Sequence, residues 1–472
     1  MSRVFTSQAN KLIGKSAVFS GWAQTVRRMG KLVFINLRDK DGLLQITCSP
    51  DIEKTYETAR KVRPEFVIQV KGKIVERDQK NINPDMATGK VEVSVEKLTI
   101  ISESETPPFE IVNEERQASE EIRLQYRYLD LRHERMKQNL VVRHQAIHFI
   151  RNYLNNEGFI EIQTPILSKS TPEGARDYLV PSRIHKGKFF ALPQSPQQYK
   201  QLLMVAGFER YFQIAPCFRD EAARADRSPG EFYQIDIEMA FVEQEDILKL
   251  SENLFSAMIK EVFPNKKIPQ TPWPRLTHAE VMKKYGTDKP DLRKDKKDKD
   301  ELAFAWIIDF PLFTKQSQED YFHGSGNKLA PSHHMFTAPK KEDIPLLESS
   351  PEQVRAYQHD LVLNGFEVGG GSIRIHQPEI QNKVFDIIGF SKDQKKQFRH
   401  LMTAFKYGVP PHGGIAPGVE RILMAIMGEK SVKEIMAFPM TGEARDPMMG
   451  APSKVAPAQL RELGIKIDKE DK

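Results

Sequence analysis

The residues best suited to chemistry lie between two apolar segments, within residues 212–241. The pattern there reads as a strand, a charged loop and a second strand. Alternation places Gln234, Asp236 and Glu238 on one face of a sheet, because successive strand side chains point to opposite faces. The loop adds Arg219, Asp220, Glu221, Arg224, Asp226 and Arg227. The pattern indicates either a binding surface or an exposed hairpin whose surface ion pairs contribute little.

Two glycine-containing segments, 364–381 and 410–428, could recognise an anion. In the first, three consecutive glycines precede Arg374 and His376, which alternate with isoleucines. Glycine lets a backbone approach a ligand closely, and an arginine there suits a carboxylate or a phosphate. In the second, glycines lead into an apolar helix that carries Arg421, and helix N-termini bind anions. A glycine bulge with an exposed arginine fits the first segment equally well.

Common nucleotide-binding loops are missing. Residues 14–16 read GKS, but position 9 is alanine, so no Walker A motif exists, and no GxGxxG opens a helix. If the chain binds ATP, it does so through a motif other than these two. The two cysteines, Cys48 and Cys217, exclude a Cys-rich zinc site and favour a reducing compartment.

Residues 17–102 read as short strands with one helix. Runs at 17–23, 32–37 and 43–48 come first, a helix-like stretch at 51–62 follows, and longer strands are expected at 66–77 and 90–101. Asp41-Gly42 predicts a hairpin. This order is that of an OB-fold. The first hundred residues hold 18 Lys+Arg against 11 Asp+Glu, which fits either a nucleic-acid surface or a solvated lysine-rich one.

The remainder reads as a linker and one long α+β domain. Apolar residues at helical spacing predict a helix over 136–156, ended by Gly158, and a strand follows it. We expect an OB-fold at 1–104, a hinge or linker at 105–135 and an α+β domain at 136–472. The charge run 293–301 should be a solvated loop within that domain.

Composition agrees with a soluble globular protein of several domains. The chain has 472 residues, of which 39% are hydrophobic and 28% charged. No apolar run is long enough for a transmembrane helix. The N-terminus shows no signal-peptide pattern, and we expect a cytoplasmic protein without a membrane partner.

Several motifs, in order, resemble those of the bacterial-type aspartyl-tRNA synthetases, a class IIb family. FRDE (218–221) before a strand resembles motif 2, GVER (418–421) resembles motif 3, and the helix before Pro165 resembles motif 1. Further matches are TPEGARDYLVPSR (171–183), PQSPQQYKQLLM (193–204), SHHMFT (332–337), EVGGGSIRIH (367–376) and RYLDLR (127–132). The resemblance runs from about residue 15 to 465. It implies an antiparallel catalytic sheet flanked by helices and a homodimer formed through motif 1.

The resemblance also implies roles in forming aspartyl-adenylate from ATP and aspartate. Arg219 would contact the α-phosphate and the substrate carboxylate, Glu221 the adenine side and Arg421 the γ-phosphate. Asp360 and Glu367 would hold Mg²⁺; they are seven residues apart, about two helical turns. No zinc is implied. The implied catalytic residues are Arg219, Glu221, Glu367 and Arg421, and the implied ATP site is Arg219, Asp220, Glu221, Ser228, Glu367, Gly418, Val419, Glu420 and Arg421.

The implied aspartate pocket rests on two cations. Arg374 and Lys200 would face the substrate side-chain carboxylate, with Asp236 orienting Lys200. Asparagine is neutral and would leave buried cations uncompensated. The implied pocket is Glu173, Ser195, Gln197, Lys200, Arg219, Gln234, Asp236, His333, His334 and Arg374.

The N-terminal module would bind the anticodon loop of tRNA(Asp), and of tRNA(Asn) in a less discriminating enzyme. Phe34 would stack on a base, with polar contacts from Arg27, Gln45, Arg77, Asn81 and Glu92. The chain departs from the family pattern in lacking the usual inserted domain, which the loop 293–301 replaces. Asparaginyl-tRNA synthetase and a non-catalytic tRNA-binding paralogue are the alternatives.

Overall fold

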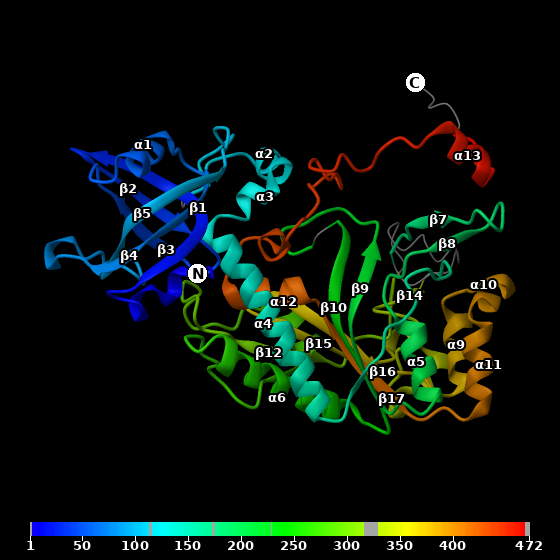
Figure 1. Ribbon diagram of the computed structural model, residues 1–472. Helices are drawn as coiled ribbons and strands as arrows, with labels where there is room; N and C mark the ends of the chain where they lie inside the picture. Colours follow the sequence, from blue (N-terminus) through cyan, green and yellow to red (C-terminus); the bar gives the residue numbers. More distant parts are fainter. Residues whose placement is uncertain (1, 113–115, 172–174, 228, 316–328, 468–472) are drawn as a thin grey trace. The chain divides into compact units, whose positions relative to one another are not determined.

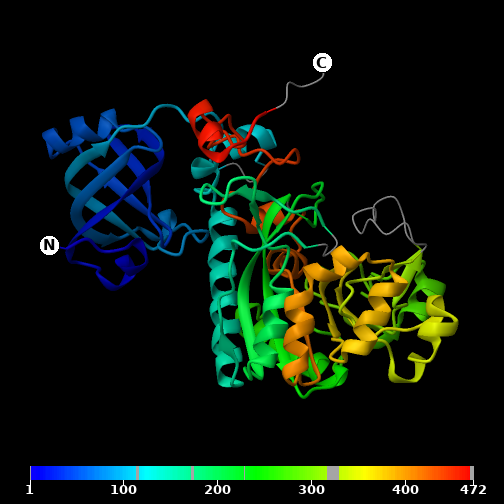
Figure 2. The ribbon, with the colours of Figure 1, turned by 90° about the vertical axis from the view of Figure 1, so that its right-hand side faces the viewer.

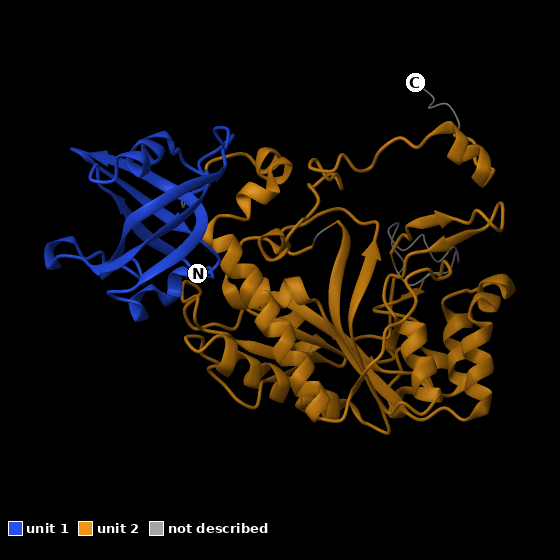
Figure 3. Cartoon of the chain, in the orientation of Figure 1, with its two compact units in different colours: residues 1–116 blue, residues 117–472 orange. Residues whose placement is uncertain are grey.

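The computed structural model describes residues 2–112, 116–171, 175–227, 229–315 and 329–467. The chain forms two compact units, Met1–Arg116 and Gln117–Lys472, coloured separately in Figure 3. Each has its own apolar core. No helix among the described residues is long and apolar enough to cross a bilayer.

The first unit is a closed five-stranded barrel, seen in blue in Figure 1. Its order around the barrel is β1-β2-β3-β5-β4, which confirms the predicted OB-fold. Gly42, in the tight β2–β3 turn, has φ +139°, a backbone angle that favours glycine. Its elements are β1 (Ser16–Met29), β2 (Leu32–Arg38), β3 (Leu43–Cys48), α1 (Glu53–Lys61), β4 (Val67–Glu76) and β5 (Val91–Ser102).

The second unit is built on an eight-stranded sheet. Its order is β11-β12-β15-β16-β17-β10-β9-β6, with antiparallel pairing except at the two edges, where β11–β12 and β6–β9 are parallel. The strands are β6 (Ile160–Glu161), β9 (Arg210–Arg219), β10 (Gly230–Ala240), β11 (Arg275–Thr277), β12 (Phe304–Ile308), β15 (Gln358–Leu363), β16 (Phe366–Ile373) and β17 (His412–Pro417). This confirms the expected antiparallel sheet.

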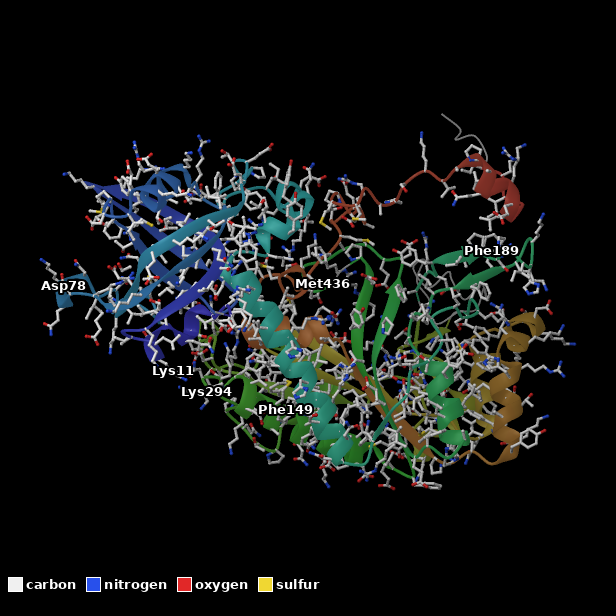
Figure 4. The ribbon with its side chains drawn as sticks, in the orientation of Figure 1. Lys11, Asp78, Phe149, Phe189, Lys294 and Met436 are labelled. Carbon is white, nitrogen blue, oxygen red and sulfur yellow. The ribbon has the colours of Figure 1, made fainter. Side chains whose placement is uncertain are left out.

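Helices cover both faces of this sheet. On one face, α4 (Glu134–Asn156), α6 (Gln244–Val262) and α12 (Val419–Met427) bury apolar side chains against Ile235 and Ile237. Phe149, labelled on α4 in Figure 4, packs against this core. Figure 2 shows α5 (Gln197–Val205), α9 (Pro378–Ile387), α10 (Lys392–Gln397) and α11 (Arg399–Ala404) on the other side of the sheet from α4. The remaining helices and strands are α2 (Glu120–Gln125), β7 (Leu179–Pro181), β8 (Phe189–Ala191), α7 (His278–Tyr285), β13 (Phe313–Lys315), β14 (Leu329–Pro331), α8 (Leu346–Ser349) and α13 (Pro457–Leu463).

The charge run at 293–301 contains no helix or strand, as predicted, and Lys294 marks it in Figure 4. The linker differs from the expectation. The division between the units falls at residue 116, so residues 117–135 belong to the second unit. The reason is Arg127, on the short helix α3 (Arg127–Asp130), which is 2% exposed. It donates hydrogen bonds to the carbonyl oxygens of Lys433, Met436 and Ala437 and pairs with Asp130.

Arg127→Ala should therefore destabilise the second unit by about 3–5 kcal/mol, because it removes the donor to three backbone carbonyls and the nearer cation of the buried Asp130, which keeps the more distant Arg123 as a cation. Urea unfolding followed by far-UV circular dichroism measures this loss. The control is Arg151→Ala, which removes an ion pair with Glu161 at the surface and should cost less than about 1 kcal/mol. Equal losses in the two variants would contradict the anchoring role of Arg127.

Candidate active site

A cavity of about 290 Å³ lies on the sheet of the second unit. Its position follows from the alternation of β10. Ile235 and Ile237 enter the core beneath α4 and α6, so Gln234 and Asp236 face the opposite side, where both line the cavity. The neighbouring strands β9 and β17, the next strand β16, helix α5 and the start of α12 supply further walls. Elements distant in sequence thus converge on one sheet face.

Four buried charges lie at the base of the cavity, where Lys200, Asp236 and Arg374 line it and Glu238 lies behind them. The Lys200 ammonium lies 2.6 Å from Asp236 Oδ1 and 3.3 Å from Glu238 Oε2. The Arg374 guanidinium donates from Nε to Glu238 Oε1 at 3.0 Å and from Nη2 to Oε2 at 3.2 Å. All four side chains are at most 2% exposed. Two cations and two carboxylates out of water are tolerable only because each is paired.

The two carboxylates respond differently to burial. Burial alone would raise both pKa values, but Arg374 and Lys200 together bring the pKa of Glu238 down to about 2. The pKa of Asp236 is raised, because burial outweighs the attraction of Lys200. Asp236 Oδ2 is buried and has no hydrogen-bond partner among the described residues. This oxygen is therefore an acceptor without a donor at the edge of the cavity.

Arg374 is fixed from further sides. Its Nη1 donates to Ser372 Oγ at 2.7 Å and contacts His334 Nε2. Burial and the neighbouring Arg374 lower the pKa of His334 well below its usual range, so the ring is neutral near pH 7. His333 also lines the cavity, and its ring lies beside that of His334.

A second cluster of charge lies where β9 enters the loop to β10. The Arg219 guanidinium sits 5.1 Å from the centre of the Phe232 ring. Glu221 pairs with Arg227 across the loop. Cations beside an aromatic face can hold a phosphate and a stacked base together.

Arg421 projects from the first turn of α12. It donates from Nε to the carbonyl oxygen of Asp226 at 3.0 Å and from Nη1 to that of Glu367 at 2.9 Å. Glu420 instead accepts from the backbone of Tyr233 and pairs with Arg143 of α4, so both its oxygens hold structure together. The Arg421 guanidinium also lines the cavity, 3.6 Å from the Asp226 carboxylate and 4.0 Å from that of Glu367, and it is the cation of this pair of residues that can contact a ligand anion.

The three glycines of β16 serve strand packing more than ligand approach. A side chain at Gly371 would lie 2.2 Å from the carbonyl oxygen of Gly414, and one at Gly369 would lie 2.9 Å from Pro417. An added Cβ at Gly370 would lie 3.3 Å from Asp360 and from His333, and one at Gly371 would also lie 2.5 Å from His359 Nε2. Of the three, Gly369 and Gly370 line the cavity, where close approach of a ligand to the backbone stays a prediction.

Asp360 and Glu367 do not share a helix face, and that geometric expectation is wrong. They lie on β15 and β16, two antiparallel strands joined by a short turn, where Glu367 pairs with Val362. Burial, reinforced by Glu367, raises the pKa of Asp360 well above its ordinary value. A divalent cation would relieve this repulsion, and Mg²⁺ sites need only one or two protein carboxylates beside phosphates. The described residues contain no group of three or more potential metal ligands.

The cavity brings together most of the residues expected from the sequence. Glu173 and Ser228 lie outside the described residues. Asp220 and Asp360 are not in its lining, and the Val419 side chain belongs to the apolar core. The expected residues that line it are Ser195, Gln197, Lys200, Arg219, Glu221, Gln234, Asp236, His333, His334, Glu367, Arg374, Gly418, Glu420 and Arg421.

The sequence placed Glu238 on the same strand face as Asp236 but gave it no role in the pocket; in the structure it holds Lys200 and Arg374 in place. One contributor had no place in the sequence-based prediction. Phe232 lines the cavity beside Arg219, and its place at the start of the same strand could have indicated it.

The barrel unit carries a polar network on its outer face. Arg27 donates to Gln45 at 3.0 Å, Gln45 donates to Glu92 at 2.7 Å, and Arg77 lies 3.8 Å from Glu92. Phe34 pairs in register with Arg27 and points away from the core. Asn81 is exposed on the β4–β5 connection and makes no side-chain contact with this network among the described residues.

Comparison with known proteins defines the class. Residues 119–442 match the family model "tRNA synthetases class II (D, K and N)", and residues 17–101 match "OB-fold nucleic acid binding domain". The chain belongs to the class II tRNA synthetases of this D, K and N family.

Individual relatives are close over their whole length. One is the "Aspartate--tRNA(Asp/Asn) ligase" of Thermoanaerobacter pseudethanolicus, 42% identical over 97% of this chain and 96% of the relative. Another is the "Aspartate--tRNA ligase" of Macrococcus caseolyticus, 40% identical over 97% of each chain. The fold is similar to that of asparaginyl-tRNA synthetase from Pyrococcus horikoshii, with a TM-score of 0.75, 23% identity and coverage of 97% and 100%.

Glu238→Gln should destabilise the protein by about 3–5 kcal/mol, because two buried cations would lose a shared carboxylate. Urea unfolding at pH 7 measures the loss. The control is Glu161→Gln, whose ion pair with Arg151 lies at the surface, so the expected loss is less than about 1 kcal/mol. A smaller loss in Glu238→Gln than in the control would refute the proposed charge balance.

Proposed function

We propose that the chain is an aspartate–tRNA ligase, which activates L-aspartate with ATP and transfers it to the 3′ end of tRNA. The observation that carries this proposal is the buried Lys200–Asp236–Glu238–Arg374 cluster at the floor of a cavity lined by Arg219 and Arg421. An ammonium has three donors and a guanidinium five. Contacts among the described residues leave at least one donor on each cation for a substrate carboxylate.

The first step joins aspartate to AMP. A substrate α-carboxylate oxygen attacks the α-phosphorus of ATP, and the bond to pyrophosphate breaks. Arg219 would neutralise charge on the α-phosphate and Arg421 on the γ-phosphate, while Glu221 contacts the adenine. Such chemistry depends on positioning and charge neutralisation more than on covalent participation by the protein. This fits a cavity of fixed cations.

The second step transfers the aspartyl group. The 3′-hydroxyl oxygen of the terminal adenosine attacks the acyl carbonyl carbon, its proton passes to a phosphate oxygen of the adenylate, and AMP leaves with the bonding electrons. No side chain lining the cavity is held as a dedicated general base among the described residues, and the neutral His334 is already engaged with Arg374. Orientation of the hydroxyl against the adenylate supplies the main advantage.

The same cluster sets the preference for aspartate over asparagine. Asparagine has almost the same shape but no charge. Its binding would bury the remaining donors of Lys200 and Arg374 against a neutral amide, and uncompensated buried cations are costly. The alternative function, asparagine activation, is disfavoured on this ground. A silent paralogue would have no reason to keep Arg219, Glu367 and Arg421 in one cavity.

Asp360 and Glu367 are the residues that would hold Mg²⁺, together with ATP phosphates. Burial, reinforced by the Glu367 carboxylate, raises the pKa of Asp360 although Gln358 donates to both of its oxygens, and a cation held between Asp360 and Glu367 would favour the ionised form of both. When bound, the cation would neutralise phosphate charge. ATP is the co-substrate, and nothing in the proposal calls for zinc.

The barrel unit would bind the anticodon loop. Phe34 offers a half-buried ring on the outer face of the barrel for stacking, and three buried polar atoms of this unit, Asn36 Oδ1, Thr47 Oγ1 and Arg77 Nη2, have no partner among the described residues. Arg27, Gln45 and Glu92 would add polar contacts, and Asn81 would reach the RNA from the β4–β5 connection. The partner is tRNA(Asp), and tRNA(Asn) in a less discriminating enzyme.

The active assembly we propose is a cytoplasmic homodimer joined through motif 1. Its support is exposed apolar residues on this segment, with Val141 39%, Ile160 51% and Ile166 47% exposed. Sedimentation equilibrium of the full chain tests it, and a monomer at micromolar concentration would refute it.

ATP–pyrophosphate exchange without tRNA tests the amino-acid assignment. The wild-type chain should exchange with aspartate and not with asparagine or lysine. Lys200→Leu should abolish exchange while leaving tRNA binding nearly unchanged, because the barrel unit is untouched. Lys383→Leu, which removes a surface ion pair with Glu348 and does not line the cavity, is the control for loss of a lysine and should retain exchange. Exchange with asparagine in the wild type would overturn the pocket assignment.

Phe34→Ala should weaken tRNA binding by about 1–3 kcal/mol, the usual value of one base stacked on an aromatic ring. Aspartate-dependent exchange should be unaffected. Filter binding measures the affinity for tRNA, and ATP–pyrophosphate exchange measures adenylate formation. Aminoacylation then measures the charging of tRNA. Phe5→Ala is the matched control, because Phe5 contacts Arg3 and Lys40 instead of lying in the strand that carries Phe34. Unchanged tRNA charging in Phe34→Ala would exclude this surface as the anticodon site.

A further inference from the structure

A buried hydrogen-bond chain leads away from the cavity behind Gln197. Gln197 lines the cavity at the start of α5, and its Nε2 donates to Gln201 Oε1 at 3.1 Å. Gln201 Nε2 lies 3.1 Å from His412 Nε2, and His412 Nδ1 lies 2.8 Å from the carbonyl oxygen of Pro410. Gln201 and His412 are both fully buried, and neither lines the cavity.

The carbonyl oxygen of Pro410, at the end of this hydrogen-bond network, fixes which atom donates and which accepts in each of its hydrogen bonds. A carbonyl oxygen can only accept, so His412 Nδ1 must carry the proton that bonds to Pro410. In the neutral imidazole the other nitrogen is then an acceptor. Gln201 must therefore present its NH₂ group to His412, which leaves Gln201 Oε1 as the atom that faces Gln197.

The surroundings keep His412 neutral. Glu238 attracts a proton to the ring, while Arg374 and His376 oppose it, and burial outweighs these charges, lowering the pKa of His412 to about 4. Phe405 covers one side of the ring. The acceptor at Nε2 is thus retained at physiological pH.

The side-chain amide of Gln197, at the cavity end of this hydrogen-bond network, therefore has one allowed orientation. Gln197 must direct its NH₂ group inward to Gln201 Oε1, so its own Oε1 remains for the cavity. No described residue donates a hydrogen bond to that oxygen. An amide normally turns either way at little cost, and here the network decides which atom faces the substrate.

We propose that Gln201 and His412 are positioning residues that hold the Gln197 amide with its oxygen toward the cavity, where it accepts a hydrogen bond from the α-ammonium of the amino-acid substrate. The inference rests on the proposed function and deepens it. The cations Lys200 and Arg374 select the side-chain carboxylate. The fixed amide selects a donor at the other end of the ligand.

The test compares two ligands that differ in this one group. L-Aspartate carries the ammonium, and succinate has both carboxylates without it. Isothermal titration calorimetry with the full chain gives both dissociation constants. In Gln201→Leu the preference for aspartate over succinate should fall about tenfold or more, the usual worth of a hydrogen bond to a charged group. Succinate affinity should change little, because the freed Gln197 amide can turn.

Two further variants separate positioning from packing. Gln201→Glu keeps an oxygen toward Gln197 and should retain most of the preference. His412→Leu removes the acceptor that orients Gln201 and should lose it. Asn139→Leu is the control, because it also removes a buried amide, one that donates to Glu429 on the opposite side of the unit. Its preference should equal that of the wild type.

The outcomes are distinguishable. Equal weakening of aspartate and succinate in Gln201→Leu, or an unchanged preference in both Gln201→Leu and His412→Leu, overturns the inference and leaves the proposed function standing. Absence of aspartate binding by the wild-type chain overturns the proposed function and the inference with it. If Gln201→Glu fails to fold by circular dichroism, His412→Leu against Asn139→Leu decides the matter.

Discussion

The pairing of two buried cations with two buried carboxylates is the constraint on which the rest of the catalytic unit depends. Lys200 comes from a helix, Asp236 and Glu238 from β10, and Arg374 from the end of β16. None of these charges would be tolerable alone at this depth. The sheet order that places β17 between β10 and β16 is therefore as much a requirement of charge balance as of packing.

Strand alternation and turn chemistry were strong enough to predict the barrel, the antiparallel hairpin of β9 and β10, and the face on which Gln234 and Asp236 lie. Separation in sequence was a poorer guide. The seven-residue spacing of Asp360 and Glu367 suits a helix and a tight hairpin equally, and only pairing between β15 and β16 decides. The partners of Arg127 lie some three hundred residues away, where no local pattern can indicate them. Glu238 was visible as a strand residue, but its role depends on that same long-range convergence.

The two units divide the proposed work by the kind of chemistry. The barrel carries an aromatic ring on its outer face and a set of basic and polar side chains beside it, as binding of a nucleic acid strand requires. The catalytic unit conceals its charges, where low dielectric strengthens their action on phosphate and carboxylate. The proposed amide orientation extends this principle, since a neutral network far from solvent can set the polarity of a recognition contact without adding charge.

The charged loop at 293–301 closes on itself. Lys294 N–H donates to Glu301 Oε1 at 3.2 Å, and Lys267 N–H donates to the carbonyl oxygen of Asp300 at 2.7 Å. Alignments with relatives extend over more positions than the chain has residues, 581 against 472, so those relatives carry segments that this chain lacks. The entropic cost of closing a loop grows slowly with its length. The two ends of this surface loop lie close together, so they can be joined by a longer inserted segment at little extra cost. The loop is thus a position at which a domain can be inserted or removed without changing the strand order of the sheet.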